Sequence, residues 1–585
     1  MSSSIDQKVA QIRTAVYGEE VRESIASAIE EIDSVAEGAR DSATASAEAA
    51  AESESASQAS KEAAARSAEG AAQSKASAEA AAARAEAAAS GSGARYGVSG
   101  IGQSAAALTR LYDAEGMVAQ VGTNGDNSAV RNDFDSAAPF MRRKCVGKWH
   151  KENDRAVFRV AAYEGDEDYA EDGSMGDYVA VECPKAYYKI TDSELTISAA
   201  RLEGFRPFDI FCRKHNPQDV MEVAYIPAYS LALDEDGHAV SLPGFDNEQG
   251  NYKQLVDAAR TYSGDAKEFA ILQPAAVNFY EWALFTVEFA TQDAQTVMMG
   301  CSNLRSSNDD KGHFIDATHF LIGNYQAARV PGQRVAIIGA SEDQYTASRK
   351  ATHKILSLTR CDANGVANAS GAYQLAEVED LGRGYYEYDT TTEYRFVGRP
   401  YQTGATRGVS TSSGSPVSNT NGYYPMKYRH RENTYANQYK TLMDLFSKRV
   451  GTGDADYYLE HYYLPDPAAY TPSTASKPDA ADLATDAFVK LDIEALHENY
   501  VNGYVKSVKR SEVYPDLWVP YQTTGASATT FFADYAYLVY SSPVRTVRLG
   551  GFWNFGRYAG FSSFSGFIAP STGLAYSGGD LFFTQ

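Results

Sequence analysis

The chain has 585 residues, which allows three or four domains at roughly 100 to 200 residues each. Apolar residues make up 44% of it, enough for a hydrophobic core, and its 40 tyrosines are typical of surfaces that bind other molecules. The formal net charge of -23 opposes binding to nucleic acid phosphates and anionic membranes, because both attract basic patches. We therefore expect neither nucleic acid binding nor membrane insertion.

The first eight residues have no apolar stretch like that of a signal peptide, and no run of about 18 apolar residues occurs in the chain. We therefore expect a soluble protein made in the cytoplasm. The cysteines are widely spaced and include no Cys-x-x-Cys pair, so we expect buried thiols and not zinc ligands or redox partners. They are Cys145, Cys183, Cys212, Cys301 and Cys361.

Residues 1–36 carry apolar side chains at intervals of three and four, the pattern of the a and d positions of a heptad. These positions are Ile5, Val9, Ile12, Val16, Ile25, Ile29 and Ile32. The register breaks around Gly18, so the segment is two short amphipathic helices or one stuttered helix. Ile and Val at both core positions favour three strands, and we expect a homotrimer seam here. The alternative is that these side chains dock on a neighbouring domain of the same chain.

Residues 37–95 are dominated by Ala, Ser, Glu, Gln, Lys and Arg. Alanine has the highest helix propensity, and about 50 helical residues at about 1.5 Å each would span roughly 75 Å. We expect a coiled-coil stalk, with a disordered linker as the alternative because alanine buries little area.

The N-terminal string from Ile12 to Ile25 reads IRTAVYGEEVRESI. It resembles the opening of many tail-fibre and baseplate proteins from phages of Gram-positive bacteria. In that family the opening precedes a helical stalk and a distal binding domain. The resemblance implies that residues 1–36 anchor the chain to phage tail or baseplate proteins, and that the protein is located in the virion.

The rest of the chain has the composition of a globular protein, and we divide it into three segments. Residues 96–135 are expected to form a Gly-rich collar or linker, 136–204 a β-rich subdomain, and 205–585 the head.

Local patterns predict several elements of these segments. Val157–Val160 and Tyr178–Val181 are typical of strands, and Asp236-Gly237 lies between apolar runs as a hairpin turn does. Helices are expected over Tyr252–Tyr262 and Phe279–Phe289. Trp282 lies in the second helix and is assigned to the core, because a large ring in an apolar helix is usually a centre of packing.

The C-terminal third carries a second motif, Arg548-Leu549-Gly550-Gly551-Phe552-Trp553. It resembles the Arg-x-Gly-Gly-x-Trp signature of the branch of C-type-lectin folds that includes formylglycine-generating enzymes. The segment Tyr428–Asn437 is similar to an earlier loop of that fold. Phage tropism determinants diversified by retroelements place their variable residues directly after this motif. The resemblance implies a C-type-lectin-like head with a variable segment at 552–576.

Gly550, Gly551 and Trp553 are expected to anchor that segment, because paired glycines allow close backbone approach and a buried tryptophan fixes the residues after it. Rings, hydroxyls and an arginine in the segment are typical of an adaptable binding surface. The expected ligand-binding residues are Phe552, Asn554, Phe555, Arg557, Tyr558, Phe561, Ser563, Ser565, Phe567, Thr572, Leu574 and Tyr576. The alternative is that the phenylalanines are core, and we expect Phe564 inside.

No catalytic residue, cofactor or metal is expected. The chain lacks Gly-x-Ser-x-Gly and His-Glu-x-x-His motifs and has no cysteine after Cys361 for oxidase chemistry. His313 and His319 are the closest candidate metal pair. The acidic loop Glu164–Asp168 lacks the spacing of a known calcium loop, which favours a solvated loop. A glycosidase needs only two carboxylates, so a depolymerase remains the alternative.

Together these patterns predict an N-terminal α-helical coiled coil followed by a β-rich or α+β head with a C-type-lectin-like fold, in an elongated trimer. The expected function is that of a phage tail structural protein that binds a host-cell surface protein or glycan through its C-terminal head. A bacterial surface adhesin is disfavoured, because we find neither a signal peptide nor a membrane anchor.

Overall fold

The computed structural model describes residues 2–14, 18–19, 23, 25–46, 57–58, 61, 93–125, 129–305, 310–342, 352–379, 392–417, 421–451, 457–496, 501–538 and 543–585. The chain divides into two compact units, residues 1–77 and 78–585. The structure is mostly β, and 17% of it is helical. Within the described ranges, no helix is long and apolar enough to cross a membrane.

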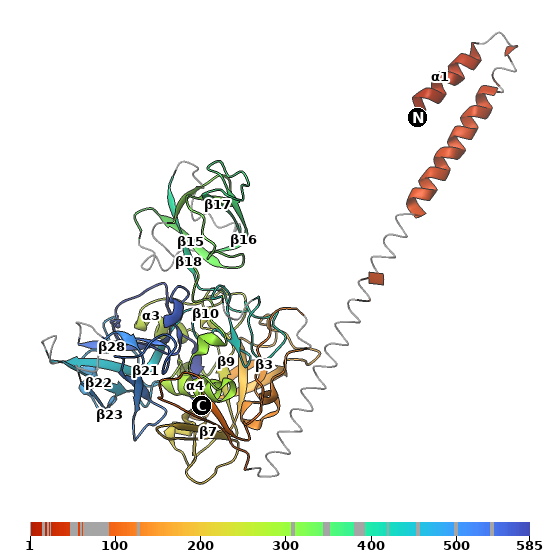
Figure 1. The fold of residues 1–585 in the computed structure, drawn as a ribbon. Helices are drawn as coiled ribbons and strands as arrows, with labels where there is room; N and C mark the ends of the chain where they lie inside the picture. Colours follow the sequence, from red (N-terminus) through yellow and green to blue (C-terminus); the bar gives the residue numbers. More distant parts are fainter. Residues whose placement is uncertain are drawn as a thin grey trace. The chain divides into compact units, whose positions relative to one another are not determined.

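The N-terminal unit contains helix α1 (Ser2–Arg13) and a second helical stretch at residues 25–46. Arg13 forms ion pairs with Glu23 at 3.2 Å and with Glu30 at 3.4 Å. In one straight helix Arg13 and Glu30 would lie about 25 Å apart, at about 1.5 Å per residue. The chain therefore turns back after α1, and the two helices lie side by side (Figure 1).

The expected long N-terminal coiled coil is wrong, because the described helices are short and fold back on each other within one chain. Of the predicted seam, Val9 is buried, whereas Ile25 and Ile32 are 45% and 68% exposed. Ile12 and Ile29 are half-buried. The side chains of Ile5 and Val16 lie outside the described residues, as does most of the expected stalk at 37–95. An apolar stripe on a helix shows that the helix packs against another surface. It does not show whether that surface belongs to the same chain or to a second copy.

The second unit begins with two antiparallel sheets. The five-stranded sheet has the order β2-β1-β7-β6-β8, and the four-stranded sheet has the order β4-β3-β5-β9. Their bounds are β1 (Tyr96–Ser99), β2 (Thr109–Tyr112), β3 (Arg143–Glu152), β4 (Arg155–Tyr163), β5 (Tyr178–Pro184), β6 (Tyr187–Ile190), β7 (Glu194–Ser198), β8 (Arg206–Pro207) and β9 (Val223–Pro227). Both predicted strands are confirmed, within β4 and β5. Residues 96–135, expected as a collar, supply two strands of the first sheet.

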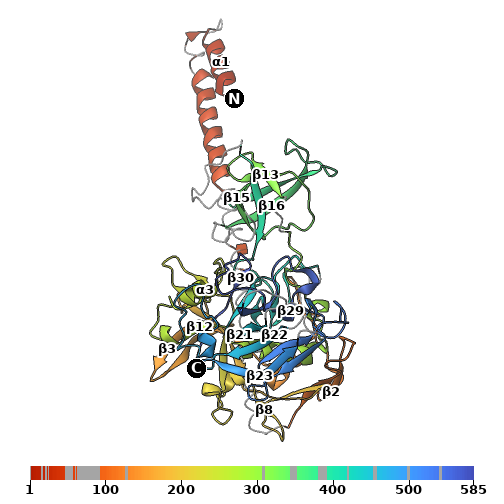
Figure 2. The same ribbon diagram turned by 90° about the vertical axis from the view of Figure 1, so that its left-hand side faces the viewer.

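The largest sheet belongs to the C-terminal third and has the order β23-β22-β21-β28-β29-β27-β24, with β30 paired to β21. Figure 2 labels strands β21, β22, β23, β29 and β30 of this sheet in the second unit. Its strands are β21 (Tyr439–Val450), β22 (Tyr458–Tyr463), β23 (Val489–Leu496), β24 (Gly503–Tyr504), β27 (Tyr535–Tyr537), β28 (Val544–Gly550), β29 (Gly560–Ser565) and β30 (Ser577–Gly578). It carries the segment that we expected to bind a ligand.

Among the described residues, the second unit also contains four short strand pairs. They are β10 (Ala232–Leu233) with β11 (Ala239–Val240), β12 (Ala270–Leu272) with β31 (Leu581–Phe583), β19 (Lys427–Tyr428) with β20 (Arg431–Glu432), and β25 (Ser507–Arg510) with β26 (Trp518–Gln522). The first pair confirms the hairpin turn predicted at Asp236-Gly237.

A closed six-stranded barrel, which was not predicted from the sequence, interrupts the expected head domain. Its order is β13-β14-β17-β16-β15-β18. Its strands are β13 (Lys311–Phe314), β14 (His319–Ile322), β15 (Arg334–Gly339), β16 (Thr352–Cys361), β17 (Tyr373–Val378) and β18 (Tyr394–Arg399). The barrel has its own hydrophobic core, which includes Phe314, Phe320 and Phe396.

The core of the second unit surrounds helix α4 (Ala275–Phe289), and helix α3 (Tyr252–Ala259) contacts strand β12; both predicted helices are confirmed. Every residue of α4 except Phe289 is buried, and Trp282 lies in the core as predicted. A helix that is apolar on all sides is stable only inside a protein. The five cysteines are buried free thiols, as expected.

Two glutamates of α4 are buried, and each pairs with an arginine. Glu281 accepts a hydrogen bond from Arg142 at 2.6 Å. Glu288 accepts from Arg429 Nε at 2.7 Å. Because a buried charge without a partner is strongly destabilising, α4 tolerates these carboxylates only with both arginines in place.

We predict that Glu281→Leu destabilises the protein by about 3 to 5 kcal/mol, because Arg142 then remains buried and charged without its partner. The double variant Glu281→Leu with Arg142→Met is expected to recover most of that loss. Urea unfolding followed by tryptophan fluorescence measures both. Glu222→Leu, which removes an exposed partner of Lys185, serves as the control and is expected to change little. Equal stability of Glu281→Leu and the wild type would contradict this account.

Candidate recognition surface

The C-terminal segment starts at a glycine turn directly after β28. Gly550 and Gly551 have φ values of 91° and 77°, in the left-handed region that favours glycine. A Cβ atom on Gly551 would lie 2.7 Å from the Cβ of Ala559. Trp553 follows and is fully buried, and its carbonyl oxygen accepts a hydrogen bond from the Leu304 N–H at 2.8 Å. This turn and its buried ring fix the start of the segment.

Part of the expected contact set lies inside the protein. The buried positions are Phe552, Phe555, Phe561, Ser563 and Ser565. Phe561 packs against the rings of Phe285 and Tyr435, both at 5.0 Å between centroids. The two serines lie in β29, which has sheet neighbours on both sides. The side chains of Phe561, Ser563 and Ser565 are therefore not accessible to a binding partner. Phe564 is also buried, as predicted.

The remaining expected contact residues reach the surface. Asn554, Arg557, Tyr558, Leu574 and Tyr576 are half-buried, and Phe567 and Thr572 are exposed. A partner can therefore touch the segment at these positions.

Rings from four separate stretches of the chain join into one layer, which we call the aromatic platform. Its members are Tyr504, Tyr535, Tyr537, Phe552, Phe555, Tyr558, Phe567 and Tyr576. Neighbouring centroids are 4.2 Å apart for Tyr535 and Tyr558, 5.6 Å for Tyr537 and Phe555, and 5.2 Å for Tyr537 and Phe567. Such spacings are those of favourable aromatic pairs.

Strand pairing brings the tyrosines of the platform together. Tyr504 of β24 is directly opposite Tyr535 of β27 in an antiparallel register. Tyr535 and Tyr537 share one face of β27, because alternate residues of a strand point the same way. The short 3-10 helix η9 (Gly556–Tyr558) adds Tyr558 to that face.

The platform is bordered by an arginine that is fixed in place. Arg557 Nη2 lies 2.5 Å from a carboxylate oxygen of Asp293 and donates to the Ala528 carbonyl at 2.6 Å. Burial raises the pKa of Asp293, and Arg557 opposes that shift. Arg557 is thus held in place by Asp293 and the Ala528 carbonyl, while its side chain remains half-buried at the surface.

Two tyrosine hydroxyls of the platform, those of Tyr504 and Tyr535, remain protonated. Burial raises the pKa of Tyr504 and of Tyr535 above the ordinary value. Both hydroxyls are therefore neutral donors and acceptors at physiological pH. The surface combines apolar rings, phenolic hydroxyls and one cation, a composition common in binding sites for proteins and sugars.

Tyr504, Tyr535 and Tyr537 lie before the glycine motif and were not among the predicted contact residues. One signal was present, because Tyr535-Ala536-Tyr537 alternates as a half-buried strand does. Their closeness to Tyr558 depends on the pairing of strands far apart in the sequence, which no local pattern contains.

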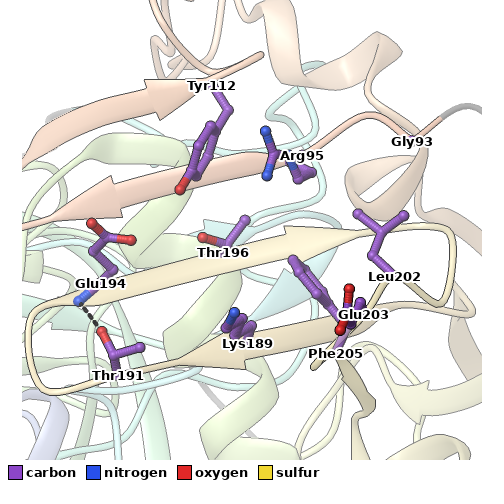
Figure 3. Close-up of a pocket in the computed structure, with 10 residues that line it drawn as sticks. All are labelled: Gly93, Arg95, Tyr112, Lys189, Thr191, Glu194, Thr196, Leu202, Glu203 and Phe205. Atoms are coloured by element: carbon purple, nitrogen blue, oxygen red, sulfur yellow. Dashed lines mark hydrogen bonds between the residues drawn. The ribbon is translucent and has the colours of Figure 1, made fainter.

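A separate cavity of about 520 Å³ lies over the five-stranded sheet (Figure 3). Its walls carry two cations, Arg95 and Lys189, and two carboxylates, Glu194 and Glu203. The Arg95 guanidinium lies 4.1 Å from the centroid of the Tyr112 ring. The charges in this cavity are balanced, which distinguishes it from the aromatic platform.

The candidate metal ligands do not come together among the described residues, where no group of three or more His, Cys, Asp or Glu side chains is placed to hold an ion. His319 instead contacts Asp316 at 2.9 Å. Glu164 of the acidic loop pairs with Lys144 at 2.9 Å.

The structure defines a β-rich protein with an inserted closed barrel and a half-exposed aromatic surface beside its C-terminal glycine turn. No protein-family model and no curated protein matches the chain.

We predict that Trp553→Ala lowers stability by about 3 to 5 kcal/mol, because it removes a fully buried ring from the floor of the glycine turn. Thermal unfolding followed by circular dichroism measures the loss. Val513→Ala truncates a side chain that is 69% exposed and is expected to melt with the wild type. A melting temperature of Trp553→Ala equal to that of the control would show that the turn has no such anchor.

Proposed function

We propose that this chain is a phage tail protein that attaches the virion to a receptor on the host-cell surface, with the aromatic platform as its contact site. The N-terminal residues bind tail or baseplate proteins, and the receptor is a host surface protein or glycan. The observation that carries this proposal is the platform itself. It is a continuous layer of eight rings, of which five tyrosines are half-buried.

The physical basis is that tyrosine supplies a large contact area at a low entropic cost. Rings that already pack on one another lose little further freedom on binding. Tyr535 and Tyr558 hold each other at 4.2 Å, and Phe552 stacks on Tyr576 at 4.3 Å with an interplanar angle of 14°. The platform is therefore preorganised, which favours affinity.

The similarity of the string Ile12–Ile25 to openings of phage tail proteins supports the proposal that the N-terminal residues bind tail or baseplate proteins. Arg548 to Trp553 supports it independently, because it resembles a motif that precedes variable receptor-contact residues in phage tropism determinants. Variation after Trp553 would be tolerated best at positions that reach the surface, such as Asn554, Tyr558 and Thr572.

We predict that Tyr535→Ala and Tyr558→Ala each weaken adsorption of the purified protein to host cells by about tenfold or more. Truncation of a central interface residue typically costs about 2 kcal/mol. Both side chains are partly exposed, so the melting temperature is expected to fall much less than for Trp553→Ala.

Tyr325→Ala is the matched control, because Tyr325 is an exposed tyrosine in the barrel region and not in the platform. Adsorption of this variant is expected to equal that of the wild type. Unchanged adsorption by both platform variants would remove the platform as the contact site.

A polysaccharide depolymerase is the second candidate, and the cavity in Figure 3 favours it by one observation. Two carboxylates, Glu194 and Glu203, line a space large enough for a sugar, beside the rings of Tyr112 and Phe205. Glycosidases require a pair of carboxyl groups. The cavity has this residue pair, but attachment remains our principal proposal.

We predict that the purified protein releases no reducing sugar from host envelope polysaccharide. Glu194→Gln and Glu203→Gln are the diagnostic variants. Release by the wild type that disappears in either variant would establish the depolymerase, and release that persists in both would indicate a contaminating enzyme.

A further inference from the structure

A second cleft lies where the barrel meets the rest of the second unit, and we call it the cationic cleft. Its volume is about 360 Å³, within the range of small-molecule sites. Its walls include Arg334, Lys354, Gln402, Arg407 and Tyr424. None of these residues belongs to the aromatic platform.

The charge of this lining opposes that of the whole protein. Among the described residues that line the cleft, three are cations, Arg334, Lys354 and Arg407, and none is a carboxylate. The chain as a whole has 76 acidic residues against 53 basic ones. Arg334 and Arg407 already form ion pairs with carboxylates, so the attraction for an anionic ligand comes from Lys354 and from the exposed Arg407 side chain.

Several polar groups of the cleft are available to a ligand. Within the described part of the chain, Lys354 Nζ has no ion-pair partner, and the side chains of Gln402 and Tyr424 form no hydrogen bond. The Arg407 side chain is 58% exposed, and its Nε lies 3.2 Å from Glu171. Lysine and arginine bind an anion, while the amide and the phenol suit neutral hydroxyl groups.

The walls of the cleft are held rigidly. Arg334 donates to Glu379 at 2.9 Å and to the Thr352 hydroxyl at 2.9 Å, and it pairs with Asp246 at 3.2 Å. These contacts tie the barrel strands β15 and β16 to the loop that carries Pro243. Four prolines stiffen the remaining walls, so that little order has to be gained on binding.

We propose that the cationic cleft binds a saccharide unit that carries a carboxylate or a phosphate. The anionic group pairs with Lys354 and Arg407, and the ring hydroxyls meet Gln402 and Tyr424. This is a binding site additional to the platform, and it rests on the proposed function only for the natural source of the sugar, the host envelope.

Isothermal titration calorimetry of the full-length protein tests the proposal with four probes: glucuronic acid, glucose 6-phosphate, glucose and inorganic phosphate. At least one charged sugar is expected to bind, and more tightly than glucose or inorganic phosphate. The charged sugar that binds identifies the anionic group. If glucose bound as tightly as the charged sugars, the proposed role of charge would be wrong. If inorganic phosphate bound as tightly, the proposal that the ligand is a saccharide would be wrong.

Lys354→Gln and Arg407→Gln are each expected to weaken that binding by about tenfold, the loss of one charge-assisted hydrogen bond. Lys354 is exposed, and Glu171 keeps its contact with Lys144 at 2.7 Å when Arg407 is changed, so both variants are expected to fold. Lys214→Gln removes a comparable exposed lysine elsewhere and is the control.

Melting curves verify folding of all three variants. Unchanged affinity in both cleft variants, or no binding of either charged sugar at millimolar concentration, would refute the proposal. The assay contains no cells and no platform variant, so its failure is distinct from a failure of platform-mediated adsorption.

Discussion

The structure of the second unit depends on two carboxylates that are buried in the middle of its core. Glu281 and Glu288 lie on a helix with no solvent-exposed face, and each needs an arginine from a distant part of the chain. Arg142 comes from the segment before β3. Arg429 lies between β19 and β20 and also donates to the Phe140 carbonyl at 2.7 Å. Two remote segments are therefore joined at one helix, and neither is free to shift without exposing a buried charge.

That constraint explains the strained loop around Arg429. Arg429 and His430 adopt positive φ values of 43° and 69°, which are unusual for residues with a side chain. Local strain persists only where the surroundings determine it strongly. Full burial of Arg429 and its hydrogen bonds to Glu288 provide that determination.

The same core supports the aromatic platform. Strand β21 is buried along most of its length and begins with Tyr439, whose ring lies 5.4 Å from Phe552 and 5.9 Å from Tyr576. Lys440, the next residue, pairs with buried Asp580 at 2.6 Å. The floor of the platform is thus continuous with the centre of the protein, and its rings are positioned by packing and not by a flexible loop.

Elements with a strong local signal were predictable from the sequence. Helix α4 has an apolar run too long for a strand, and the Asp-Gly turn between β10 and β11 has a defined backbone requirement. The coiled coil failed because the stripe that includes Val9 fits a folded-back helix of the same chain as well as a second copy. The barrel was missed because its short strands acquire a common core only when six of them close.

In the candidate site, too, the residues with a local sequence signal were predictable and those placed by long-range strand pairing were not. Gly551 and Trp553 were predicted as anchors from the motif alone, because a glycine permits an unusual backbone conformation and a tryptophan supplies a large ring for the core. Ser563 and Ser565 were assigned to the surface as polar residues, but β29 is an interior strand, and a position in a sheet is not written in a local sequence. The place of Tyr535 in the site depends on the pairing of β27 with β24, which puts Tyr535 opposite Tyr504.

The two candidate surfaces must respond differently to salt. The platform consists of aromatic rings bordered by one cation, Arg557, which is already paired with Asp293. Its contacts therefore depend mainly on apolar area, which monovalent salt changes little. The cationic cleft lies in a protein of net charge -23, which repels an anionic cell surface at long range. Charges are screened beyond about 8 Å at physiological ionic strength. An anion therefore experiences the attraction of Lys354 and Arg407 only after close approach, which contact through the platform can provide.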